Sequence, residues 1–189
     1  MKRMLFFLLV VLFAVPVMSQ TADETAPPAE SEAPPMGPPP EIQELSGLIG
    51  TWDVAMKFRW APTDTIWEES KGTCVFSYAA DGAVLMMVFE SEMQGTPFVG
   101  LSLQCFDRET NKWQSVWTDN MGARISFYTG DKAADKIVMT GEELYQGVKS
   151  IGRLTTYNLT ETSFDWLMET SYDGGKTYAV MGSARYTKQ

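Results

Sequence analysis

Residues 51–60 read TWDVAMKFRW, and this stretch decides the fold class. Large apolar side chains occupy every second position, with small or charged ones between them: Trp52, Val54, Met56, Phe58 and Trp60 against Asp53, Ala55, Lys57 and Arg59. Successive side chains of a strand point to opposite faces of the sheet. The alternation therefore predicts a β-strand with one buried and one solvated face.

Nine further strand candidates follow, separated by turn sequences such as Asp81-Gly82 and Asp173-Gly174-Gly175. We expect them at residues 71–78, 83–92, 97–106, 112–119, 123–129, 135–141, 147–158, 163–171 and 176–187. A meander of this length loses both exposed edges if it closes on itself. The sequence therefore predicts an all-β fold: a single antiparallel up-and-down β-barrel of about ten strands. Residues 41–48, EIQELSGL, place Ile42, Leu45 and Leu48 on one face of a short N-terminal helix that would plug one end.

Residues 1–40 differ in composition from the rest of the 189-residue chain. A basic head, an apolar run over residues 4–15 and the small residues Val17 and Ser19 predict a secretory signal peptide at residues 1–19. The run is shorter than the ~20 residues of a membrane-spanning helix, although an uncleaved anchor remains an alternative. Residues 20–40, rich in Pro, Ala and acidic residues, predict a disordered linker. The barrel domain is then residues 41–189, exported to a periplasm or secreted, with no membrane span after cleavage.

The net charge and the absence of histidine exclude several functions. The chain has 15 Lys and Arg, 24 Asp and Glu, and no histidine, for a net charge of −9. This acidic balance argues against electrostatic binding of nucleic acid. Without histidine, His-based catalytic triads and His-ligated zinc or haem sites are excluded. We therefore name no catalytic or metal-binding residue from the sequence and expect no cofactor.

Cys74 and Cys105 are the two cysteines. They fall on expected strands that have a third strand between them. Next-but-one strands lie ~9–10 Å apart, whereas a disulfide needs Cα atoms within about 7 Å. We favour two separate thiols, and a disulfide, which an exported protein could form, stays open.

Gly50-Thr51-Trp52 opens the first strand directly after the expected helix, and Arg185 stands near the end of the last strand. This start resembles the G-x-W motif of lipocalins and the wider calycin barrels. In those proteins the Trp packs at the closed end of the barrel, often under an Arg from a late strand. The resemblance implies that Trp52 and Arg185 form a structural cation–π pair.

A series of short motifs in one order is similar to the bacterial family DUF1579, for which a calycin-like barrel is expected. The motifs are Leu48-Ile49-Gly50-Thr51-Trp52, Lys71-Gly72, Cys105-Phe106-Asp107, Lys112-Trp113, Trp117-Thr118-Asp119, Tyr128-Thr129-Gly130 and Ala184-Arg185-Tyr186. Cys105-Phe106-Asp107 departs from the family's usual Gly-Tyr-Asp. The resemblance implies the fold and hardly constrains the function. Nitrobindin-like calycin barrels hold haem iron with a histidine, which this chain lacks.

Residues 171–178, SYDGGKTY, resemble the Asp-box of sialidase-type propellers, with Tyr178 in place of the final Trp. The motif occurs once, so we interpret it as a structural β-turn in which Asp173 caps backbone N–H groups.

Methionine and aromatic side chains of the strands are candidates for the lining of an apolar lumen. The candidates are Met56, Phe76, Met87, Trp113, Trp117, Trp166 and Met168. Asp119 and Arg124 stand on either side of an Asn-Met-Gly turn near the expected barrel mouth. As a pair they could orient a polar group of a ligand, and a surface ion pair is the alternative reading.

These features favour an exported, non-catalytic barrel that binds a small, mainly apolar ligand. Two alternatives stay open. One is a protein-interaction or structural module carried on the acidic linker. The other is a hydrolase or isomerase that uses carboxylates such as Asp119, Asp165 or Glu169. The sequence leaves the oligomeric state open.

Overall fold

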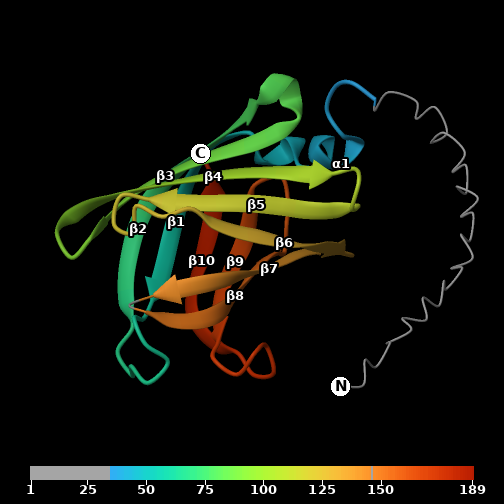
Figure 1. Ribbon diagram of the computed structural model, residues 1–189. Helices are drawn as coiled ribbons and strands as arrows, with labels where there is room; N and C mark the ends of the chain where they lie inside the picture. Colours follow the sequence, from blue (N-terminus) through green and yellow to red (C-terminus); the bar gives the residue numbers. More distant parts are fainter. Residues whose placement is uncertain (1–34, 146) are drawn as a thin grey trace, which may run out of the picture. The chain divides into compact units, whose positions relative to one another are not determined.

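The strands of the computed structural model form a closed antiparallel barrel (Figure 1). The structure describes residues 35–145 and 147–189. Its elements, in order, are α1 (Pro40–Gln43), the 3-10 turn η1 (Ser46–Leu48), β1 (Gly50–Phe58), β2 (Glu68–Ala79), η2 (Ala80–Gly82), β3 (Val84–Met93), β4 (Thr96–Asp107), β5 (Lys112–Asp119), β6 (Ser126–Ala133), β7 (Lys136–Tyr145), β8 (Val148–Tyr157), β9 (Ser163–Ser171) and β10 (Ala179–Lys188). Each strand pairs with its neighbour in the chain, and β1 also pairs with β10. The predicted all-β barrel of about ten strands is confirmed.

Strand β1 has the alternation that its sequence predicts. Trp52, Val54 and Phe58 are buried, and the intervening residues 53, 55 and 57 are exposed. Trp60 lies beyond the end of the strand with 37% of its surface exposed. Its ring packs edge-on against Phe58, with 5.3 Å between the centroids. The apolar face of β1 therefore points into the barrel along its whole length.

Residues 40–48 form the plug of the barrel. Ile42, Leu45 and Leu48, the three residues predicted to share a face, are 0%, 1% and 5% exposed. The plug consists of two short turns, α1 and η1, because the backbone leaves the helical region at Leu45 (φ −93°, ψ 8°). The Trp52 Nε1–H donates a 2.7 Å hydrogen bond to the Leu48 carbonyl, which ties the plug to the first strand.

The folded part begins earlier than residue 41. The compact unit starts at Met36, Pro39 is buried, and the Gly37 carbonyl accepts a hydrogen bond from Arg108 at 2.8 Å. The predicted signal peptide and residues 20–34 of the predicted linker lie outside the described residues. Within the described part, none of the helices has the length and hydropathy required to cross a bilayer.

The predicted strand 123–129 is displaced along the chain: as β6 it begins at Ser126 and ends at Ala133. The Asp119 carboxylate accepts hydrogen bonds from the Met121 and Gly122 N–H groups, and Ala123 has a positive φ of 46°. This local turn chemistry keeps residues 120–125 out of the sheet.

Candidate ligand-binding cavity

A cavity of about 300 Å³ occupies the barrel interior. Every strand contributes side chains to it, because inward-facing residues alternate along each strand. It extends from Leu45 and Leu48 of the plug to Arg59, Trp60 and Met121 at the opposite end, which we call the mouth. The lining is mostly aromatic, leucine and methionine side chains, so the cavity suits an apolar guest.

Seven of the nine residues predicted to line the lumen border this cavity: Met56, Phe76, Met87, Trp117, Asp119, Trp166 and Met168. Trp113 does not border it. Its side chain is 2% exposed and packs edge-on against Phe106, with 5.6 Å between the ring centroids. Trp113 therefore fills the interior between strands β4 and β5 and belongs to the core.

The predicted Asp119/Arg124 pair is not formed. The Asp119 carboxylate accepts hydrogen bonds from the Trp117 indole at 2.8 Å and from the N–H groups of the following turn. None of the four ion pairs among the described residues includes Asp119 or Arg124. Arg124 instead lines an open groove of about 900 Å³ beside β6–β9. Asp119 stays at the mouth because the turn that it caps holds it there.

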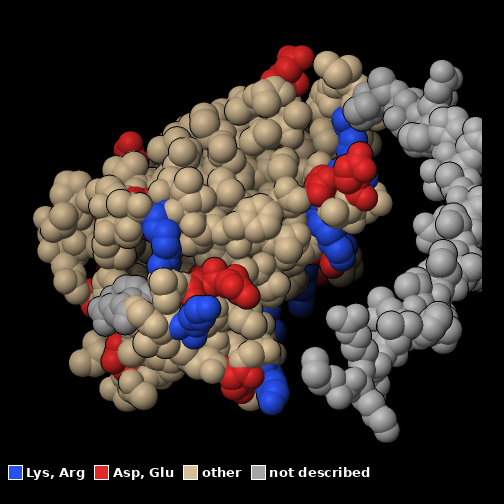
Figure 2. All heavy atoms as spheres, in the orientation of Figure 1, with Lys and Arg blue, Asp and Glu red and all other residues tan. Residues whose placement is uncertain are grey.

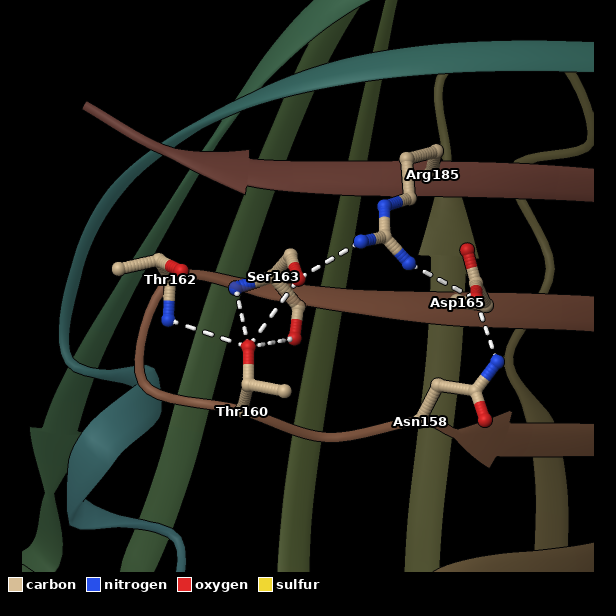
Figure 3. Close-up of polar contacts among 6 residues, drawn as sticks. All are labelled: Asn158, Thr160, Thr162, Ser163, Asp165 and Arg185. Atoms are coloured by element: carbon tan, nitrogen blue, oxygen red, sulfur yellow. Dashed lines mark hydrogen bonds and ion pairs between the residues drawn. The ribbon is translucent and has the colours of Figure 1, made fainter.

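The predicted pairing of Arg185 with Trp52 is also wrong. The Nζ of Lys188 lies 5.5 Å from the Trp52 ring centroid and donates to the Gly47 carbonyl at 2.9 Å. Ala184 and Tyr186 are buried, so Arg185 between them points to the outer face. There it donates to Asp165 at 2.9 Å and to Ser163 at 2.7 Å (Figure 3).

The carboxylates considered for catalysis lie apart. Asp165 and Glu169 stand on the outer face of β9, four residues apart, which is about 13 Å along a strand. Glu169 accepts two hydrogen bonds from Arg153 at 2.7 and 2.8 Å, whereas Asp119 lies at the mouth. Partial burial acts to raise the pKa of Asp165, but hydrogen bonds from Asn158 and Arg185 outweigh it and leave the pKa below its ordinary value (Figure 3). These three carboxylates do not form an acid–base pair.

The two cysteines are free thiols on different faces of the wall. Cys74 is paired in register with Trp52, inside the barrel, and burial raises its pKa to about 12. Cys105 lies between Gln104, which borders the cavity, and Phe106, which packs on Trp113, so its side chain points outward. Burial, with the nearby Asp107 charge, raises the pKa of Cys105 as well. Neither thiol is therefore activated as a nucleophile.

Asp173 holds the turn between β9 and β10. Its carboxylate accepts hydrogen bonds from the backbone N–H groups of Lys176 and Thr177 at 3.0 and 2.9 Å, and from the Thr177 hydroxyl at 2.6 Å. The hydrogen bonds, led by those from Thr177, hold the pKa of Asp173 well below its usual range. Its role in the structure is to order this loop.

Several polar lining residues were missed by the sequence reasoning: Ser102, Gln104, Ser115, Tyr128 and Thr156. The Tyr128 hydroxyl donates to Glu143 at 2.6 Å, and burial, followed by the Glu143 charge, raises the Tyr128 pKa. The other four carry uncharged side chains. Nothing in their residue type separates them from solvent-facing strand residues.

Within the described residues, no group of three or more Cys, Asp or Glu side chains is placed to hold a metal ion.

Comparison with known proteins places the chain in a family. A search of curated proteins finds no match. Among solved structures, the barrel is similar to Rv2717c from M. tuberculosis, with 15% identity, a TM-score of 0.58, and coverage of 80% of this chain and 99% of that chain. It is also similar to the S-type phycobiliprotein lyase CPES from Guillardia theta, with 8% identity, a TM-score of 0.51, and coverage of 78% and 91%. At these identities the likeness shows the fold.

The profile of the family described as "Protein of unknown function (DUF1579)" matches residues 37–176. The chain therefore belongs to the DUF1579 family.

Proposed function

We propose that this protein is a non-catalytic binder of a small, mainly apolar ligand, which it holds in the barrel cavity after export from the cytoplasm. The observation that carries the proposal is the cavity itself. Its volume of about 300 Å³ is at the lower end of the ~300–1,000 Å³ typical of ligand sites. A small guest of up to three aromatic rings, or a short acyl chain, fits that size class.

The energetic cost of such a cavity supports a functional reading. Empty apolar volume destabilises a protein by about 24 cal/mol per Å³. A dry cavity of about 300 Å³ would then cost on the order of 7 kcal/mol, similar to the ~5–15 kcal/mol net stability of a whole domain. A bound guest would recover part of this cost through packing contacts.

The fluorescent probe N-phenyl-1-naphthylamine tests this proposal. Trp117 and Trp166 border the cavity, so a bound probe should quench tryptophan emission by energy transfer, with saturation. Met87→Trp would fill the cavity and should weaken binding by about tenfold or more, a free-energy change of ~1.4 kcal/mol. Val75→Trp is the matched control, because Val75 is 45% exposed on the outer face of β2. Non-saturable binding, or equal affinities in the two variants, would contradict the proposal.

Export rests on the sequence of residues 1–19 and has its own test. Expression in a bacterial host with a secretion pathway should yield a mature chain that begins at Gln20. N-terminal sequencing of the purified protein gives the result directly. A chain that retains Met1 in the cytoplasmic fraction would refute the export part and leave the binding part standing.

A second candidate function, protein interaction, is favoured by apolar side chains that border the groove beside β6–β9. Ile125 and Phe127 are 72% and 50% exposed there, and Tyr172 is 54% exposed. Exposed apolar side chains grouped in this way mark many interaction surfaces. Phe127→Ser would separate the two functions: it should leave probe binding unchanged, and under the second function it should abolish capture of a partner from host extract.

A further inference from the structure

Strand β4 reverses the usual orientation of polar and apolar side chains. Ser102 and Gln104 border the cavity, whereas Leu103 between them is 38% exposed on the outer face. Leu101 shares that outer face. In Figure 2, the side of the molecule over β4 and β5 carries few charged residues. A polar interior face paired with an apolar exterior face costs stability, and departures of this kind concentrate at functional sites.

Three side chains make this polar region, which we call the polar wall: Ser102, Gln104 and Ser115. Gln104 and Ser115 are directly paired in register between β4 and β5. The hydroxyls of Ser102 and Ser115 lie 3.1 Å apart, and Ser115 is 6% exposed. The polar wall is thus one contiguous patch in a mostly apolar lining.

The hydrogen-bonding capacity of the polar wall is not used up by the protein. Among residues 35–145 and 147–189, no hydrogen bond involves the side-chain amide of Gln104, which provides two donors and an acceptor. The Ser102 and Ser115 hydroxyls hydrogen-bond to each other at 3.1 Å, and the Ser115 hydroxyl also donates a long hydrogen bond to the Val116 carbonyl at 3.5 Å. Each hydroxyl oxygen retains acceptor capacity. The wall therefore offers a guest several neutral donors and acceptors inside the barrel.

Charged groups bordering the cavity are confined to the mouth and are already engaged. Arg59 donates to the carbonyls of Val180 and Asp64 at 2.8 and 3.2 Å, and Asp119 caps its own turn. An ionised guest group at the polar wall would have no partner of opposite charge beside it, because Arg59 and Asp119 lie at the mouth. Burying such a charge without a partner is far more costly than burying a hydrogen-bonded neutral group.

We infer that the cavity selects an apolar molecule that carries one uncharged hydrogen-bonding group, a carbonyl or a hydroxyl, which binds the polar wall through Gln104 and the two serines. This inference rests on the proposed function, since it specifies the ligand class of the same cavity. Carboxylates and ammonium compounds of the same size are discriminated against.

Three naphthalenes of similar size test the inference by displacement of N-phenyl-1-naphthylamine at pH 7: 1-acetylnaphthalene, 1-ethylnaphthalene and 1-naphthoate. The acetyl compound should bind about two- to tenfold more tightly than the ethyl compound, as one neutral hydrogen bond predicts. The carboxylate should bind more weakly than both. Equal binding of the acetyl and ethyl compounds, or tightest binding of the carboxylate, overturns the inference while the proposed function stands. Failure of the probe and of all three compounds to bind refutes the proposed function itself.

Substitutions in the polar wall test which residues make the hydrogen bond to the guest. Gln104→Leu should remove the preference for the acetyl compound and leave the affinity for 1-ethylnaphthalene equal or higher. Ser102→Ala should reduce the preference in part, and it provides the test should Gln104→Leu fail to fold. Gln114→Leu is the matched control, because the Gln114 amide donates to Asp107, at 2.8 Å, and does not border the cavity. An unchanged preference in both Gln104→Leu and Ser102→Ala would refute the role of the polar wall.

Discussion

The hydrogen bond from Trp52 to Leu48 makes a specific prediction about the stability of the plugged end. Trp52 is fully buried, its Nε1–H reaches the Leu48 carbonyl at 2.7 Å, and its ring packs on Phe76 and Phe164 at centroid distances of 6.4 and 5.1 Å. Trp52→Phe keeps an aromatic ring in place but removes the donor and part of the ring volume. The Leu48 carbonyl then loses that donor in a buried position.

The expected magnitude follows from these two losses. An unsatisfied buried acceptor costs about 1–3 kcal/mol. The void left by the smaller ring adds roughly 1 kcal/mol, a fraction of the ~3–5 kcal/mol typical of Trp→Ala. Trp52→Phe should therefore lower the free energy of unfolding by about 2–4 kcal/mol. Urea denaturation followed by circular dichroism measures this change directly.

Trp60→Phe provides the control within the same segment of chain. The Trp60 indole also donates a hydrogen bond, to Glu68 at 2.6 Å, but Trp60 is 37% exposed, so water can replace the lost partner. We expect a loss of about 1 kcal/mol or less. Equal losses in the two variants, or a loss below about 1 kcal/mol for Trp52→Phe, would refute the claim that this bond anchors the plug.

Three further predictions concern the buried thiols and the cavity wall. First, stability should fall as pH rises above about 9. The Cys74 thiol ionises near pH 9 in the unfolded chain, whereas burial raises its pKa to about 12 in the folded protein. Between these pH values the free energy of unfolding falls by about 1.4 kcal/mol per pH unit for each such group. Cys74→Ala should reduce that slope by the same amount, measured by urea titrations at several pH values. Second, iodoacetamide should label the half-buried Cys105 before the buried Cys74 in native protein and both at once in denaturant; equal native rates by mass spectrometry would contradict the burial described here. Third, Gly100→Ala would place a Cβ 2.1 Å from the Trp117 ring, so it should cost about 1–3 kcal/mol and change probe affinity, whereas Gly47→Ala, which meets no atom within 4 Å, should leave probe affinity unchanged.

The sequence predicts the fold well because its signals are local and repeated. These signals are the alternation in β1, the turn residues between strands and the three apolar residues of the plug. Each of them depends only on residues close together in the sequence, and the closed barrel is the arrangement that satisfies all of them. The boundary of β6 was missed for a similar local reason. The Asp119 cap competes with sheet pairing, and residue type alone does not say which of the two is formed.

The candidate site was less predictable, because it depends on which face each residue takes. Arg185 was placed with Trp52 by resemblance, but its position between two buried residues points it outward, and Lys188 reaches the indole instead. Polar Ser102 and Gln104 face inward only because the register of β4 puts Leu103 outside. Strand parity across a turn is set by the tertiary structure and cannot be counted from the first strand alone.

The closing of the barrel between β1 and β10 also has a consequence during synthesis of the chain. Lys188 contacts Gly47 across 141 residues of sequence. The second edge of β1 can therefore pair with β10 only after nearly the whole chain has been synthesised. Contacts of such high separation slow folding, and an unpaired edge can pair with another chain in the meantime. A nascent or truncated chain that lacks β10 exposes the edges of both β1 and β9. Loss of the last strand should therefore cause aggregation of the chain.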